Sequence, residues 1–235
     1  RNALSVAAAD ALTECWAQID ADDAICAAVL DAADCGTFCA GMDLKEMAAA
    51  RAAGDDLLAR MKDPFQQRLR AVRKPVVAAL TGHFSGAGML LAMGADIRIG
   101  CAGTRAAISE ARFGRGTSWT VPLLWMLPQP VLSEMVLTGD PVPVEDLWRH
   151  GFINHLEADA QAVRARAQAI ACRIGENAPL SVRAAKATLA AGMDHGCAAG
   201  IERGEALHRA VYASADATEG PKAFAEGRRP LWQGR

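Results

Sequence analysis

Hydrophobic residues between positions 74 and 100 change their spacing in a way that predicts four consecutive elements. Val76–Leu80 is an unbroken run of β-favouring apolar residues, which is typical of a strand buried on both faces. A glycine-rich turn at 82–88 follows it, and residues 89–93 are good helix formers. Asp96–Cys101 then predicts a second strand. The stretch therefore reads as a strand, a tight turn, a short helix and a strand.

The remainder of the chain alternates between strand and helix patterns as far as residue 157 and is helical beyond it. In the first part we expect strands at 25–30 and 152–156, a short β segment followed by a Gly/Arg-rich loop at 104–116, and helices at 5–19, 45–60, 65–73, 121–127, 132–137 and 144–150. In the second part we expect helices at 158–176, 179–191, 197–213 and 219–228. The pattern predicts an α/β protein with residues 1–157 as its core and residues 158–235 as a helical C-terminal region.

Composition places the chain among ordinary globular proteins. Its 235 residues are 51% apolar and 22% charged, with a net charge of −2, so nothing favours a nucleic-acid partner. No apolar run approaches the roughly 18–20 residues that span a bilayer, and we expect no membrane association. From the abrupt start at Arg1 we expect that a leading segment precedes the given sequence.

The cysteines point to a reducing compartment. There are seven of them, no pair has the C-x-x-C spacing of a metal site, and several lie in apolar periodic segments. An odd number of thiols in such surroundings favours reduced cysteines in the core. We therefore expect a cytoplasmic protein without a metal site.

Gly82, Gly86 and Gly88 surround the start of the short helix expected in the central stretch. A turn this tight directs unpaired backbone N–H groups, and the positive end of the helix, at whatever lies in front of it. Such a place suits a phosphate group or an oxygen that becomes negative during a reaction. The spacing matches neither the dinucleotide pattern G-x-G-x-x-G nor a Walker loop, and Ser85 does not stand in a G-x-S-x-G sequence. Gly41 precedes another expected helix in the same manner.

Five pieces of sequence follow one another in a recognisable order. They are R-N-A-L-S at 1–5, F-C-A-G-M-D-L at 38–44, K-P-V-V-A-A-L-T-G-H-F-S-G-A-G-M-L-L-A-M-G-A-D-I-R-I at 74–99, L-T-G-D at 137–140 with G-F-I-N-H at 151–155, and E-G-P-K-A-F-A-E-G-R-R-P-L-W at 219–232. In this order they resemble the crotonase (enoyl-CoA hydratase/isomerase) family. The resemblance implies a spiral of ββα units with a helical C-terminal trimerisation region, assembled as a homotrimer or a dimer of trimers.

The resemblance also implies a coenzyme A thioester as substrate, with no other tightly bound cofactor. Two backbone N–H groups hold the thioester oxygen as it becomes an enolate, and the matching positions are Met42 and Ala87. Each follows a glycine turn before an expected helix, and one such donor is worth roughly 3–4 kcal/mol of transition-state stabilisation. Ala87 stands where the family usually has glycine. The residues matched to substrate or CoA binding are Asn2, Ala3, Leu4, Ala40, Gly41, Asp43, Leu44, Lys45, Gly86, Leu90 and Phe224.

The chain departs from the family at the two glutamates that hydratases use. Leu90 and Arg112 are aligned with them, so neither position carries a carboxylate. Glu110 lies two residues before Arg112, and residues i and i+2 of a strand share a face. Glu110 therefore either reaches the site or forms a salt bridge with Arg112. Arg112 either binds a carboxylate on the acyl chain or anchors its loop.

Three functions remain open at this point. The first is a lyase or isomerase of the enoyl-CoA hydratase type with atypical acid and base residues. The second is an acyl-CoA-binding relative with little or no hydratase activity. The third is a serine hydrolase of the related Clp type, in which Ser85 is the nucleophile, although no histidine or aspartate is marked as its partner. His83 is a further candidate base, and Trp119, Trp125 and Met126 either line an acyl pocket or pack in the core.

Overall fold

Two small sheets form the body of the protein, and the first six strands alternate between them. The computed structural model describes residues 1–55, 65 and 67–235. Within these residues one sheet has the order β1-β3-β5-β8 and the other the order β2-β4-β6-β7, and all neighbouring strands are parallel except β6 and β7. The strands are β1 (Ala28–Leu30), β2 (Thr37–Cys39), β3 (Val76–Leu80), β4 (His83–Ser85), β5 (Ile97–Cys101), β6 (Arg105–Ala107), β7 (Val142–Pro143) and β8 (His155–Glu157).

This alternation of β1–β6 winds the chain into a spiral, because each turn gives one strand to each sheet before a helix follows. β1, β2 and α2 form one such unit, and β3, β4 and α5 form the next. The ββα spiral and the helical C-terminal region expected from the sequence are thus confirmed. The helices are α1 (Val6–Ala21), α2 (Leu44–Ala52), α4 (Gln67–Ala71), α5 (Ala87–Gly94), α6 (Gln129–Thr138), α7 (Val144–Arg149), α8 (Ala160–Gly175), α9 (Pro179–His195), α10 (Cys197–Tyr212) and α11 (Ala215–Ala225), with 3₁₀ helices η1 (Glu110–Phe113) and η2 (Ser118–Trp125).

Some elements differ from the sequence prediction. β4 lies inside the stretch expected as a turn, because its residues pair with both β2 and β6. η1 occupies the end of the segment expected as β structure, and η2 replaces the helix expected at 121–127, with Pro122 inside it. The helix expected at 45–60 is described as far as Ala52, and residues 56–60 lie outside the described residues.

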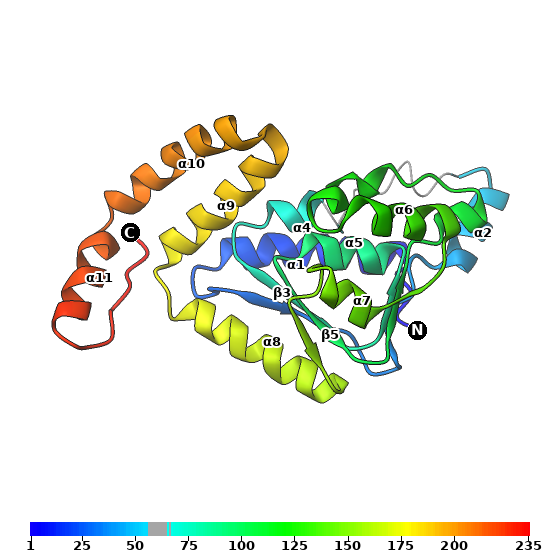
Figure 1. The fold of residues 1–235 in the computed structure, drawn as a ribbon, viewed down its shortest axis with the longest axis horizontal. Helices are drawn as coiled ribbons and strands as arrows, with labels where there is room; N and C mark the ends of the chain where they lie inside the picture. Colours follow the sequence, from blue (N-terminus) through cyan, green and yellow to red (C-terminus); the bar gives the residue numbers. More distant parts are fainter. Residues whose placement is uncertain (56–64, 66) are drawn as a thin grey trace.

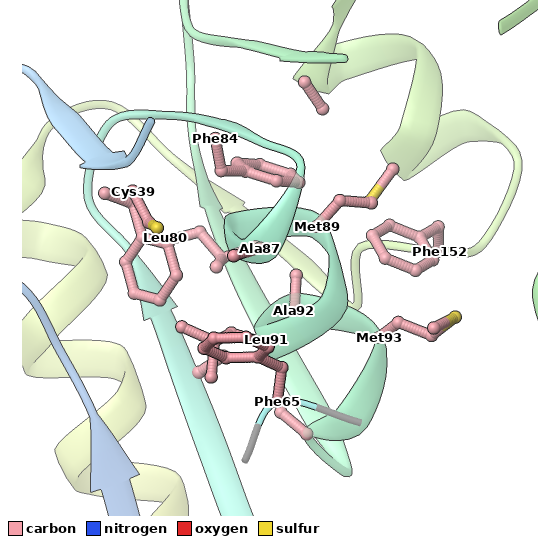
Figure 2. Packing of buried hydrophobic residues seen from close by; sticks show 14 of the residues in the cluster. Cys39, Phe65, Leu80, Phe84, Ala87, Met89, Leu91, Ala92, Met93 and Phe152 are labelled. Carbon is pink, nitrogen blue, oxygen red and sulfur yellow. The ribbon is translucent and has the colours of Figure 1, made fainter. Parts of the chain in front are cut away.

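The sheet β1-β3-β5-β8 is buried on both faces, as the apolar run of β3 predicts. Val76, Ala78 and Leu80 pack in a core shared with α1 and α5, whereas Val77 and Ala79 pack against α8. Figure 1 shows α8 on one side of this sheet and α1 and α5 on the other. Figure 2 shows buried side chains surrounding α5 on several sides. α5 is therefore held rigidly, which fixes the direction of its N-terminus.

All seven cysteines are free thiols, but most of them lie at the surface. Cys39 and Cys101 are buried and the other five are exposed, so the expectation of core thiols is wrong for most of the set. Cys15 illustrates the reason. It precedes the buried Trp16 on α1, and neighbouring residues of a helix point about 100° apart, so Cys15 faces solvent. Within the described residues no three His, Cys, Asp or Glu side chains form a group able to hold a metal ion.

α9 and α10 form a hairpin whose helices touch through small residues. A Cβ atom on Gly204 would stand 2.6 Å from Cγ2 of Thr188, and one on Gly200 would stand 2.6 Å from Cα of Gly192. Figure 1 shows this hairpin reaching away from the sheets, with α11 at the end of the molecule opposite α2. In the part of the chain that the structure describes, no helix has the length and apolar character to cross a membrane.

Arg98, on β5, anchors the C-terminal end of α5. Its guanidinium donates to the carbonyl oxygens of Ala92 (3.2 Å), Ala95 (2.6 Å) and Phe152 (2.6 Å) and lies 4.9 Å from the centre of the Phe152 ring. Burial lowers the pKa of Arg98 to about 10, so the side chain stays charged at neutral pH. A cation at this end complements the helix dipole.

Replacing Arg98 by methionine is expected to lower the free energy of unfolding by roughly 3 kcal/mol or more, because buried carbonyl groups lose charged donors. Urea unfolding followed by circular dichroism measures the loss. Arg166→Met is the matched control, since Arg166 makes an exposed salt bridge to Glu157 (2.7 Å) of the kind worth under about 1 kcal/mol. Equal losses in the two variants would contradict the anchoring role.

Candidate active site

Two glycine turns meet where β2 and β4 end. The two strands are parallel neighbours, so their C-terminal ends lie at the same edge of the sheet. Gly41 (φ +102°) follows β2 and Gly86 (φ +53°) follows β4, and side chains other than glycine are strained at such angles. A Cβ atom on Gly86 would stand 3.5 Å from Cα of Gly41, and one on Gly41 would stand 3.9 Å from the nitrogen of Ala87. The two turns are therefore in backbone contact.

The N–H of Met42 is turned away from the segment that pairs beside it. Leu4 and Met42 form a parallel bridge, in which the N–H of Leu4 donates to Gly41 O and the N–H of Asp43 donates to Leu4 O, both at 2.9 Å. In this pattern the residue between the two bonds directs its own N–H to the opposite side. Among the described residues the N–H of Met42 has no acceptor.

The N–H of Ala87 is unpaired for a different reason. Ala87 is the first residue of α5, and the first N–H groups of a helix have no acceptor within it. Gly86 O accepts from the N–H groups of Met89 (2.9 Å) and Leu90 (3.1 Å), and no described group accepts from Ala87. The two unpaired N–H groups, one from each turn, border the same cavity.

This cavity has a volume of about 710 Å³. The residues lining it that the sequence singled out for the site are Ala40, Gly41, Met42, Leu44, Ser85, Gly86, Ala87, Leu90, Glu110 and Trp119. The lining residues that the sequence missed are Met47, Phe65, Ser109, Phe113, Arg115 and Gly116. No local spacing marks the missed residues, because they come from three separate places: α2, Phe65 (two residues before α4 begins) and the loop around η1. The Gly/Arg-rich composition of that loop was the one available signal.

Among the described residues that line the cavity, Glu110 is the one with a carboxylate side chain. Its Oε2 is buried and has no hydrogen-bond partner among the described residues. A Cβ atom on Gly86 would stand 3.7 Å from its Oε1, so the carboxylate lies beside the second glycine turn. Burial raises the pKa of this carboxyl group above its ordinary value of 4.5. A buried carboxyl group with a raised pKa, next to two unpaired N–H groups, is suited to moving a proton.

Arg112 does not line the cavity, and it does not pair with Glu110. Its Nε donates to Thr138 O (3.2 Å), and its Nη2 forms a salt bridge with Asp140. Of the two alternatives that the sequence left open for Glu110, the salt bridge with Arg112 is therefore wrong. That expectation assumed a strand, whereas both residues belong to the 3₁₀ helix η1, which has three residues per turn, so i and i+2 point in different directions. The cavity thus has the carboxylate of Glu110, which lies two residues before Arg112, the residue aligned with a hydratase glutamate.

Asn2 and Asp43 support the first turn. The Asn2 amide donates to the carbonyl oxygens of Ala33 and Thr37, both at 2.8 Å, which ties the N-terminal segment to β2. The Asp43 carboxylate accepts from two N–H groups in the first turn of α2 and is the N-cap of that helix, as Asp immediately before a helical segment predicts. Leu4 acts through the bridge to Met42. These residues shape the backbone that presents the Met42 N–H.

Ala3, Lys45 and Phe224 lie outside the cavity lining. All three are exposed, and Phe224 is 89% exposed on α11, at the far end of the molecule from α2 (Figure 1). The structure of one chain therefore does not bring Phe224 to the cavity. The contacts of these residues with CoA stay a prediction.

Ser85 borders the cavity without the partners of a catalytic serine. Its hydroxyl donates to Ala40 O (3.2 Å), and Nδ1 of His83 accepts from the N–H of Arg105 (2.9 Å). Among the aromatic candidates, Trp119 lines the cavity while Trp125 is 61% exposed, and Met126 packs against the core. The geometry gives no support to the serine-hydrolase hypothesis.

Comparison with known proteins shows the family of the chain. The family model described as enoyl-CoA hydratase/isomerase matches residues 1–235. An (E)-benzylidenesuccinyl-CoA hydratase of Thauera aromatica is 31% identical over 225 residues, which cover 95% of this chain and 87% of the relative. The enoyl-CoA hydratase EchA19 of Mycobacterium tuberculosis is 32% identical over 244 residues, which cover 100% of this chain and 90% of the relative. A crystal structure of an enoyl-CoA hydratase from Mycobacterium tuberculosis H37Rv has a TM-score of 0.88 at 31% identity, covering 99% of this chain and 90% of that one.

A ββα spiral with two unpaired N–H groups from adjacent glycine turns over one cavity defines a protein of the crotonase fold. The chain belongs to the enoyl-CoA hydratase/isomerase family and is an acyl-CoA-processing member of it. The family resemblance drawn from the sequence is confirmed.

Proposed function

We propose that the protein adds water to, or removes it from, an α,β double bond of an acyl-CoA thioester. In this proposal the N–H groups of Met42 and Ala87 hold the thioester oxygen, and Glu110 moves the proton. The observation that carries the proposal is the buried, unpaired Oε2 of Glu110 beside the second glycine turn. The names of the relatives, which are hydratases and a carnitinyl-CoA dehydratase, support this chemistry over mere binding.

One carboxylate is sufficient for the proton transfers of hydration. Ionised Glu110 takes a proton from water while the water oxygen bonds to Cβ, and the electrons of the double bond move onto the thioester oxygen. The N–H groups of Met42 and Ala87 stabilise the enolate, each by roughly 3–4 kcal/mol. Protonated Glu110 then gives the proton to Cα, and the thioester and the carboxylate are restored. A raised pKa suits this cycle, because Glu110 acts both as a base and as an acid.

Crotonyl-CoA tests the function directly. We expect loss of its conjugated enone absorbance at an ordinary enzymatic rate, on the order of 1–10³ s⁻¹. Thermal unfolding with butyryl-CoA, a saturated thioester, tests binding separately, and at about 100 times Kd it adds roughly 2.7 kcal/mol of stability. Binding without turnover would favour the alternative of an acyl-CoA-binding relative. Absence of both would contradict the two hypotheses together.

The same proposal includes three further points. The protein lies in the cytoplasm, and the CoA thioester is its sole non-protein group. The residues that contact CoA are Asn2, Ala3, Leu4, Lys45 and Phe224. Assembly as a homotrimer or a dimer of trimers through the helices α9–α11 is part of the proposal as well. Exposed apolar residues on the projecting hairpin support this assembly, among them Leu189 (77%) and Tyr212 (79%). Analytical ultracentrifugation is expected to give three or six times the chain mass of 24.7 kDa, and a monomer would contradict the assembly.

A further inference from the structure

Arg115 lines the cavity without an ionic partner. Within the described structure its side chain makes no hydrogen bond and no salt bridge. Arg112, three residues earlier, contrasts with it, because that guanidinium is satisfied by Thr138 and Asp140. Arg115 is an exposed residue of the lining, so its unpaired side chain is open to solvent and available to a ligand that enters the cavity.

The backbone fixes Arg115 relative to Glu110. η1 ends at Gly114 (φ +63°), whose N–H donates to Ala111 O (3.3 Å), and the N–H of Arg115 donates to Glu110 O (3.0 Å). These two bonds form a Schellman motif, which closes a helix end in a defined geometry. Glu110 and Arg115 thus occupy the two ends of one closed turn, and both residues line the cavity.

The two charges do not neutralise each other. No salt bridge joins Glu110 to Arg115 in the described structure, and the Glu110 pKa is raised by burial rather than lowered by a nearby cation. Much of the remaining lining is apolar, including Leu90, Phe113 and Trp119. A ligand in the cavity meets a proton-transfer group at Glu110, carbon-lined walls, and a separate cation at Arg115.

We propose that the acyl chain of the substrate ends in a carboxylate, and that Arg115 binds it. This inference rests on the proposed function and names the substrate class of the same site. A guanidinium recognises a carboxylate through two parallel hydrogen bonds, which fix direction as well as charge. The apolar walls accommodate the carbon chain between the thioester and that terminal carboxylate.

The test compares pairs of thioesters with equal carbon number. The pairs are 2-pentenoyl-CoA with glutaconyl-CoA, and 2-hexenoyl-CoA with 2-hexenedioyl-CoA, and the second member of each pair adds a terminal carboxylate. The protein is expected to favour the carboxylated member of at least one pair by about tenfold or more in kcat/KM, which corresponds to about 1.4 kcal/mol. Arg115→Met is expected to abolish this preference, and Arg115→Lys to keep part of it. Arg112→Met, on the outward side of the same loop, is expected to leave the ratio unchanged.

Other outcomes overturn the proposal in distinguishable ways. Equal rates on both members of each pair would refute a carboxylated substrate while leaving the hydratase function in place. An equal loss on both members in Arg115→Met would assign Arg115 to the CoA portion that all substrates share. If no thioester is hydrated, the proposed function fails, and calorimetric titration with glutaryl-CoA and pentanoyl-CoA decides the inference. Tighter binding of glutaryl-CoA that is lost in Arg115→Met would support it, and equal binding would refute it.

Discussion

Replacing Glu110 by glutamine is expected to lower kcat by about 10²–10⁴-fold, because the amide keeps the size of the side chain but cannot take a proton from water. The measurement is the initial rate of enone loss with the preferred enoyl-CoA thioester. KM is expected to change far less than kcat, since the thioester oxygen still meets both backbone N–H groups. Glu134→Gln, at an exposed position on α6, is the matched control and is expected to behave like the parent.

Stability distinguishes a catalytic Glu110 from a structural one. In the folded chain burial raises its pKa above the ordinary 4.5, so folding favours the protonated form. The contribution of Glu110 to stability is present below the unfolded pKa and is lost as pH rises through the folded pKa. Glu110→Gln removes a buried charge at neutral pH, and we expect its Tm to rise there and to match the parent in acid. A variant that loses Tm at neutral pH together with activity would point to a structural role instead.

Much of the fold followed from the sequence because its causes are local. The five apolar, mostly β-favouring residues Val76–Leu80 fill both faces of one strand, as is typical of a strand in a parallel sheet covered on both sides. Gly41 and Gly86 mark their turns because their positive φ values exclude most side chains. Asp43 caps α2 by hydrogen bonds to N–H groups two and three residues further on, so the cause of its role lies within a short local segment.

The features that the sequence did not reveal have distant causes. The direction of Glu110 depends on whether residues 110–113 form a strand or a 3₁₀ helix, and a segment this short carries too few residues to show a period. Arg98 lies in an otherwise apolar strand. Its guanidinium is there because it binds carbonyl groups at the end of α5 and at Phe152, which lie in other segments of the fold. Arg115 reads as an ordinary loop residue until the fold places its loop over the cavity.

Replacing Ala87 by proline is expected to lower kcat by about 10²–10³-fold, because proline has no N–H to donate to the enolate oxygen. Ala87 is the first residue of α5, a position that proline favours, and its N–H has no acceptor in the described structure. The fold therefore loses no hydrogen bond. Ala160→Pro is the matched control, because Ala160 is the first residue of α8, far from the glycine turns, and activity is expected to persist there.

A second proline, in place of Met42, tests whether the two N–H groups act on one shared oxygen. The Met42 N–H also has no acceptor in the described part of the chain, so Met42→Pro removes no hydrogen bond of the fold. If both N–H groups hold one oxygen, the loss in kcat of the double variant is expected to differ from the sum of the two single losses, expressed as free energies. The reason is that groups which act on the same atom do not contribute independently. Thermal shifts with a saturated thioester show whether the substrate still enters. Undiminished turnover in Ala87→Pro, or strictly additive losses in the double variant, would mean that the two turns do not act on a shared oxygen.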